Sequence, residues 1–157
     1  MYSDIAKRFT DLFADVFPDD NGAHKPEITK IGDTFFDEKL IHKTARGELV
    51  RSKSEVIIAN VLNAKDDAYR YECPLDLGSG LRFYPDFMIL SRKTRKVILW
   101  EHFGMMGNPE YAENAVAKIH LYQKHGYFLG DNLIATFESQ GHPLDPEDVR
   151  RIASKYL

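Results

Sequence analysis

The sequence contains a single cysteine, Cys73, among its 157 residues. One thiol cannot form a disulfide within the chain, and it is too few for a cysteine-ligated zinc site. The disulfide-stapled class of small secreted domains is therefore excluded. A reducing, cytoplasmic compartment is the expected location.

Long apolar runs are also missing from the sequence. No stretch approaches the roughly 20 apolar residues that a membrane-spanning helix needs. The opening residues MYSDIAKRF contain no apolar segment of the kind found in secretory signals. We therefore expect a protein without a membrane partner.

Positive charge is not in excess, because 21 Lys and Arg residues face 24 Asp and Glu residues, for a net charge of −3. A protein with this balance has no overall basic field that would attract nucleic acid. Any nucleic-acid role must then depend on a local basic patch. The length fits one domain with a core of its own, and we see no internal repeat.

What the sequence does contain is an apolar stretch interrupted by acids, LRFYPDFMILSRKTRKVILWEHFG, at residues 81–104. Two β-type runs, 81–90 and 96–100, flank the polar segment SRKTRK, which predicts a hairpin. Asp86 follows Pro85 within the first run, and Glu101 follows the second. A buried carboxylate is costly unless it is paired, protonated or metal-bound. Because cross-strand neighbours lie about 5 Å apart, these two acids outline a divalent-cation site.

The remaining patterns predict helices and strands around this hairpin. A first apolar helical face covers residues 3–17, and residues 23–48 carry no clear pattern. The later elements are a largely buried helix within 49–64, a strand at 69–75, a turn at 76–80, a helix at 109–125, a strand at 133–137 and a helix from 145. This order predicts a mixed α/β layer. Residues 1–45 are interpreted as an N-terminal helical elaboration of a single domain.

A third acid, Glu55, lies within the predicted helix at 49–64, one turn in from its polar start at residues 51–54. One interpretation is a solvated first-turn residue that complements the helix dipole. The other is an acid that belongs to the same site as Asp86 and Glu101.

The ordered segments RSKSE, FYPDF, ILWEHFGM, NPEYAENAVAKIHLYQKHGY and LIATFES, read in this secondary-structure context, resemble the PD-(D/E)XK, restriction-endonuclease-like nuclease superfamily. The likeness is closer to its WEHxG nuclease-like domains, some of which are appended to bacterial helicases. It covers residues 46–157 and leaves 1–45 outside. The resemblance implies a restriction-endonuclease-like αβββαβ core flanked by helices.

The resemblance also implies a metal-dependent nuclease acting on DNA in preference to RNA. Asp86 and Glu101 would be ligands of Mg²⁺ or Mn²⁺, and Glu55 would bind or orient the same site. Hard oxygen ligands suit these ions, which retain waters for substrate and nucleophile.

The sequence departs from the superfamily pattern at position 103, where Phe103 replaces the usual lysine. His102 is a poor replacement because alternate residues of a strand point to opposite faces, although its carbonyl remains a possible metal contact. The better candidate is Lys118 on the next helix, where Lys118 and Tyr122 resemble a QxxxY motif. The alternative is an ordinary lysine at the helix edge whose ammonium reaches solvent.

Nucleic-acid contacts are expected from Arg51, Lys53, Lys118 and Lys124, with base stacking by Tyr122 as an option beside core packing. Two further hypotheses stay open. One is a nuclease-fold domain that binds nucleic acid or a protein partner without cleavage, which Phe103 and the acidic pI favour. The other is an unrelated α/β protein with coincidental acids. A protein partner or a homodimer would supply targeting that a small domain lacks.

Overall fold

The computed structural model describes residues 40–78 and 80–157. The predicted helix at 3–17 and most of the N-terminal elaboration lie outside these residues. The described part begins with a two-stranded pairing of β1 (His42–Lys43) and β2 (Leu49–Val50).

A four-stranded mixed sheet forms the centre of the molecule, with strand order β3-β6-β7-β8. The strands are β3 (Ala68–Tyr71), β6 (Phe87–Leu90), β7 (Val97–Phe103) and β8 (Leu133–Phe137). β3, β6 and β7 pair antiparallel, whereas β8 runs parallel to β7. A parallel neighbour requires a crossover connection, and the helix α3 (Pro109–Lys124) supplies it. The predicted mixed α/β layer is thereby confirmed.

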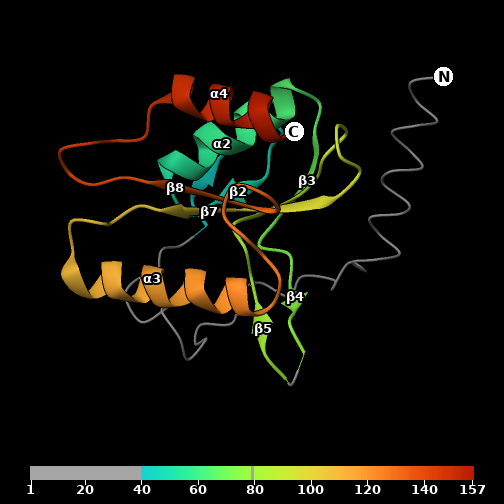
Figure 1. Ribbon diagram of the computed structural model, residues 1–157. Coiled ribbons are helices and arrows are strands. Elements are labelled where there is room, and N and C mark those ends of the chain that lie inside the picture. Colours follow the sequence, from blue (N-terminus) through green and yellow to red (C-terminus); the bar gives the residue numbers. More distant parts are fainter. Residues whose placement is uncertain (1–39, 79) are drawn as a thin grey trace.

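Helices cover both faces of the sheet (Figure 1). α2 (Lys53–Ala64) and α4 (Pro146–Tyr156) pack together on one face, and α3 lies on the other. Each helix begins at a polar cap whose side chain accepts a backbone N–H: Ser52 for α2, Asn108 for α3 and Asp145 for α4. These caps satisfy donors that a helix start leaves without partners.

The core has two halves because β6 and β7 are buried on both faces. Phe87 and Trp100 point toward α2 and α4, and both are fully buried there. Met88 follows Phe87 in β6, and Leu99 precedes Trp100 in β7. Both point toward α3. This explains why both strands are nearly continuous apolar runs in the sequence.

Several predicted boundaries shift for local reasons. Residues 49–50 form β2, so the helix starts only after its Ser52 cap. The run 81–90 is divided into β5 (Arg82–Phe83) and β6, with Pro85 between them, since proline lacks an N–H for the ladder. The strand at 69–75 ends at Tyr71, and β4 (Leu75–Asp76) pairs with β5 instead. β7 continues past Trp100 to Phe103, which places Glu101 inside the strand.

Candidate functional site

Asp86 and Glu101 lie beside each other on the α3 face of the sheet. Phe87 pairs with Trp100, and continuing this antiparallel register by one position sets Asp86 opposite Glu101. Asp86 is 8% exposed and Glu101 only 2%. Both carboxylates are therefore buried, with Glu101 inside β7 and Asp86 directly before the first residue of β6.

Two side chains of α3 hold Glu101. The Lys118 ammonium lies 3.0 Å from Oε1 and 3.1 Å from Oε2, and the Tyr122 hydroxyl donates to Oε1 at 2.5 Å. Lys118 and Tyr122 are four residues apart and so share one helix face. Burial, followed by the charge of Glu101, raises the pKa of Tyr122 well above its ordinary value. Both oxygens of Glu101 are thus occupied by donors from one helix.

Asp86 is fixed by the backbone of the neighbouring strand. The His102 N–H donates to Asp86 Oδ2 at 2.7 Å. The charge of Asp86 also acts on Tyr111 of α3. Burial, and after it the charge of Asp86, raises the pKa of Tyr111 to about 12. The Tyr111 hydroxyl in turn accepts the Gly104 N–H at 3.2 Å. β7 and α3 therefore enclose the Asp86–Glu101 pair.

Glu55 is buried in the first turn of α2, 8% exposed, and is not a solvated residue. Its Oε2 accepts the Tyr71 hydroxyl at 2.6 Å and the Arg51 N–H at 3.0 Å. Burial raises the pKa of the Glu55 carboxyl despite these hydrogen bonds. Tyr71 thus contacts Glu55 and also lies in the field of Asp86.

The three predicted acids nevertheless do not form a ready coordination shell. Within residues 40–78 and 80–157, no group of three or more His, Cys, Asp and Glu side chains could hold a metal ion. The expectation that Glu55, Asp86 and Glu101 converge on one point is wrong for this structure. The physical reason is that Tyr71 satisfies Glu55, while Lys118 and Tyr122 satisfy Glu101.

His102 points away from these acids, as its place in the strand predicts. Its Nδ1 lies 2.9 Å from the Thr136 hydroxyl, which also accepts the Trp100 indole N–H at 3.1 Å. Nε2 lies 3.3 Å from Glu138 Oε1, an oxygen that accepts a 2.8 Å hydrogen bond from Ser54. Burial lowers the pKa of His102. The ring of His102 is thus part of a polar network on the α2 and α4 face.

Two predicted nucleic-acid contacts do not fit the structure. The guanidinium of Arg51 is committed to Glu72, with nitrogen–oxygen distances of 2.7 and 3.1 Å. Tyr122 has no exposed surface, so its ring cannot stack on a base. Lys53 and Lys124 are exposed and remain available.

Sequence reasoning missed Glu72, Thr136 and Glu138. Glu72 is buried at 6% exposure although it follows a strand, because its backbone adopts a φ of 47° and turns the side chain toward Arg51. The polar residues Thr136 and Glu138 at the end of an apolar strand were the available signal for the network around His102.

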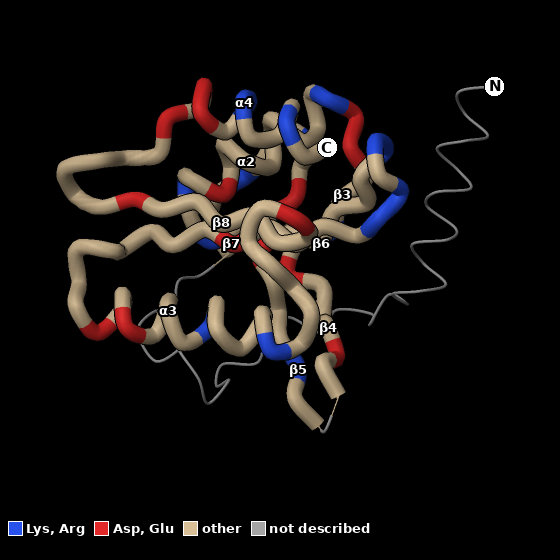
Figure 2. The backbone as a smooth tube through the Cα atoms, in the orientation of Figure 1, with Lys and Arg blue, Asp and Glu red and all other residues tan. Residues whose placement is uncertain are grey.

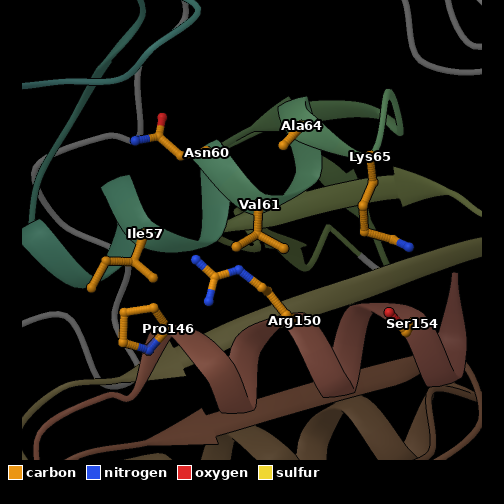
Figure 3. Close-up of a pocket in the computed structure, with 8 residues that line it drawn as sticks. All are labelled: Ile57, Asn60, Val61, Ala64, Lys65, Pro146, Arg150 and Ser154. Atoms are coloured by element: carbon orange, nitrogen blue, oxygen red, sulfur yellow. The ribbon is translucent and has the colours of Figure 1, made fainter.

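A groove of about 420 Å³ lies between α2 and α4, on the opposite face of the sheet from Asp86 and Glu101 (Figure 3). The Arg150 side chain lies across it, between Pro146 and Val61. None of the acids of the candidate site lines this groove.

Among the described helices, none is long and apolar enough to cross a membrane.

Comparison with known proteins finds similarity to an archaeal protein over part of the chain. Over 85 residues, 54% of this chain, the sequence is 36% identical to the uncharacterized protein MJ1519 of Methanocaldococcus jannaschii. The match spans 7% of that protein's length. No protein-family model matches the chain, and no solved structure matches it.

Glu55 should make stability depend on pH. Its folded pKa lies above the ordinary value of 4.5, so the folded state holds this proton more tightly than the unfolded state does. The stabilisation is full below pH 4.5 and is lost as pH rises through the folded pKa. Urea unfolding at a series of pH values should show a shallower decline across this window in Glu55→Gln than in the parent. Parallel stability curves for the two proteins would contradict the prediction.

Removing the Lys118–Glu101 ion pair should change the free energy of unfolding. Lys118→Met leaves a buried carboxylate without its cation, which typically costs about 3–5 kcal/mol. Lys118→Met combined with Glu101→Gln removes both charges and should recover most of that loss. Urea denaturation of the parent, the single variant and the double variant measures both terms. A double variant as unstable as the single one would show that the charge pair is not the cause.

Proposed function

We propose that the protein is a metal-dependent nuclease that hydrolyses phosphodiester bonds, in DNA rather than RNA, and that its sheet and helices form a restriction-endonuclease-like core. The observation that carries the proposal is the Asp86–Glu101 pair. Two buried carboxylates, one directly before β6 and one within β7, continue the register of these paired strands, and a lysine from the following helix contacts Glu101. The order of motifs along the chain agrees with this proposal.

Two carboxylates of the kind that hard divalent cations take lie side by side, although the described residues hold no preformed group of three such ligands. Asp86 and Glu101 offer carboxylate oxygens, the ligands that Mg²⁺ and Mn²⁺ prefer. When bound, either ion would lower the pKa of a coordinated water and neutralise charge that develops on the scissile phosphate. Glu55 would assist through Tyr71, which contacts Glu55 and experiences the charge of Asp86.

Lys118 has two successive tasks in this proposal. In the structure its ammonium neutralises Glu101 by contacting both carboxylate oxygens. For Glu101 to serve as a metal ligand, the ammonium must move away from at least one of them. A positioned ammonium beside the site can then stabilise a phosphate oxygen as negative charge develops on it.

Phe103 cannot supply the charge that a lysine supplies at this position in the superfamily. Its ring is buried at 4% exposure and stacks on Phe137 with a centroid distance of 5.5 Å. His102 faces the other side of the sheet, so its side chain does not replace the lysine either. Its backbone N–H instead orients Asp86.

The second candidate function is binding of nucleic acid or a protein without cleavage. The occupied oxygens of Glu101 and the apolar residue at 103 favour it. The presence of both carboxylates with Lys118 favours the nuclease.

A cleavage assay decides between the two functions. Labelled single-stranded DNA, duplex DNA and RNA are incubated with the purified protein and Mn²⁺ or Mg²⁺, with EDTA as the metal-free reaction. We expect metal-dependent products that Asp86→Asn abolishes, because the amide retains the acceptor for the His102 N–H but removes the negative charge. Calorimetric titration of Mn²⁺ into both proteins provides the matched binding measurement. Absence of products from the parent protein on every substrate would reject the nuclease and leave the binding function.

Lys118→Ala should reduce cleavage by about 10²–10³ fold, the usual loss for one positioned charge-stabilising donor. Lys118→Arg should rescue only in part, since a planar guanidinium replaces a point charge. His102→Ala, which removes only a side chain on the opposite sheet face, is the milder control. Rates are compared at a temperature where circular dichroism shows every variant folded. Parental activity in Lys118→Ala together with lost activity in His102→Ala would show that the roles are assigned to the wrong residue.

A further inference from the structure

The turn between β6 and β7 concentrates positive charge. Four of the five residues at 92–96 are Lys or Arg, and all five are exposed. Backbone hydrogen bonds from Arg95 to Ser91 (2.9 Å) and from Ser91 to Lys96 (3.0 Å) define the turn. Arg95 has a φ of 61°, which completes the reversal. The turn therefore presents its basic side chains from a defined backbone.

The fold brings further lysines to this turn from distant parts of the chain. The Lys93 ammonium donates to the Lys155 carbonyl at 3.0 Å, which ties the turn to the end of α4. Asp67, at the start of β3, experiences the charges of both Lys65 and Arg92. Figure 2 shows Lys and Arg positions at the end of the molecule near β3 and the C-terminus, with acidic positions beside them. We call the exposed residues Lys65, Arg92, Lys93, Lys96 and Lys155 the basic end.

A cavity of about 210 Å³ opens within the basic end. Lys93, Lys96 and Lys155 contribute to its wall, together with the polar residues Thr94 and Asn132. Acids offset part of this charge, since Asp66 pairs with Arg92 at 2.8 Å and Asp67 lies in the field of Lys65 and Arg92. At the cavity itself, Asp131 is one carboxylate against three lysines.

The chemistry of the basic end fits phosphates better than a protein surface. Protein interfaces have an apolar core, whereas the large apolar side chains of this cavity wall are limited to Ile98 and Tyr156. Exposed ammonium groups, by contrast, supply the salt-dependent attraction on which phosphate-backbone binding depends. The protein carries a net charge of −3, so a local positive surface of this kind is what a polyanion would require.

We infer that the basic end binds the phosphate backbone of nucleic acid. The inference deepens the proposed function, on which the choice of polyanion rests. The basic end takes the place of Arg51 as the expected phosphate contact, because the Arg51 guanidinium is paired with Glu72. The basic end is a surface of its own, because Lys155 and Tyr156 of α4 line its cavity, whereas Glu101 faces α3.

The test measures binding apart from catalysis. Fluorescence anisotropy of a labelled duplex is recorded in EDTA at several salt concentrations, for the parent and for a variant with Lys93, Lys96 and Lys155 changed to Gln. We expect the variant to bind at least about tenfold more weakly at low salt. Its slope of log K against log salt should be shallower by up to about 2.7, or about 0.9 for each phosphate that the variant no longer neutralises.

A charge-matched control separates the site from net charge. Lys43, Arg150 and Arg151 are exposed and lie outside the basic end, and their change to Gln removes the same charge. This control should bind within about twofold of the parent, and thermal unfolding checks that both variants remain folded. Equal weakening in the two variants, or none in the first, would overturn the inference.

Competition identifies the polyanion. Unlabelled DNA should displace the labelled duplex at a far lower concentration of charge than poly-L-glutamate does. Equal displacement by the two polymers would overturn the nucleic-acid assignment and favour an acidic protein partner. Because these measurements contain no metal, loss of DNA binding in the lysine variant supports the inference even where the parent fails to cleave.

Discussion

The burial of Glu101 is the constraint around which the structure is organised. A carboxylate with 2% exposure is tolerated only where cations and hydrogen-bond donors replace water. Lys118 and Tyr122 do so from α3, and this fixes the rotation of α3 about its axis relative to the sheet. The helix otherwise buries little, since Ala115 and Tyr122 are its only buried residues. The polar contacts therefore contribute much of the specificity with which α3 docks.

β7 connects the polar groups on the two faces of the sheet. Glu101 faces α3, whereas the next residue, His102, extends its ring toward Thr136 and Glu138. The same His102 contributes its backbone N–H to Asp86. Because β7 pairs with β6 on one side and β8 on the other, these groups are held by an interior strand. The position of Glu101 is therefore fixed by two ladders of backbone hydrogen bonds, and Asp86 is fixed to β7 through the His102 N–H.

The order of elements and the facing acids could be predicted from the sequence because they follow local rules. Alternation decides that Glu101 and His102 face opposite sides, and helical spacing puts Lys118 and Tyr122 on one face. The partners of Glu55 could not be predicted in the same way. Tyr71, at the end of β3, donates a hydrogen bond to Glu55. The positive φ of the next residue, Glu72, bends the chain there, and no sequence pattern predicts that bend.

The same limit explains the misplaced nucleic-acid contacts. A sequence shows that Arg51 is basic, but only the packed structure shows that Glu72 already holds its guanidinium. A tyrosine at position 122 could stack on a base or pack in the core. Its complete burial shows that it packs in the core. Conversely, the sequence does not show that Lys155 belongs to the basic end, because its neighbour Lys93 is distant in the chain.

The parallel pairing of β7 with β8 has a consequence for the time course of folding. The hairpin of β6 and β7 closes a short turn, whereas His102 and Thr136 are separated by 34 positions. Closing the longer loop costs more chain entropy before any contact offsets it. The hairpin can thus bring Asp86 and Glu101 together early, while their lysine and tyrosine partners arrive only with the crossover helix. In the interval two acids face each other without a cation, and their repulsion opposes the hairpin until α3 docks.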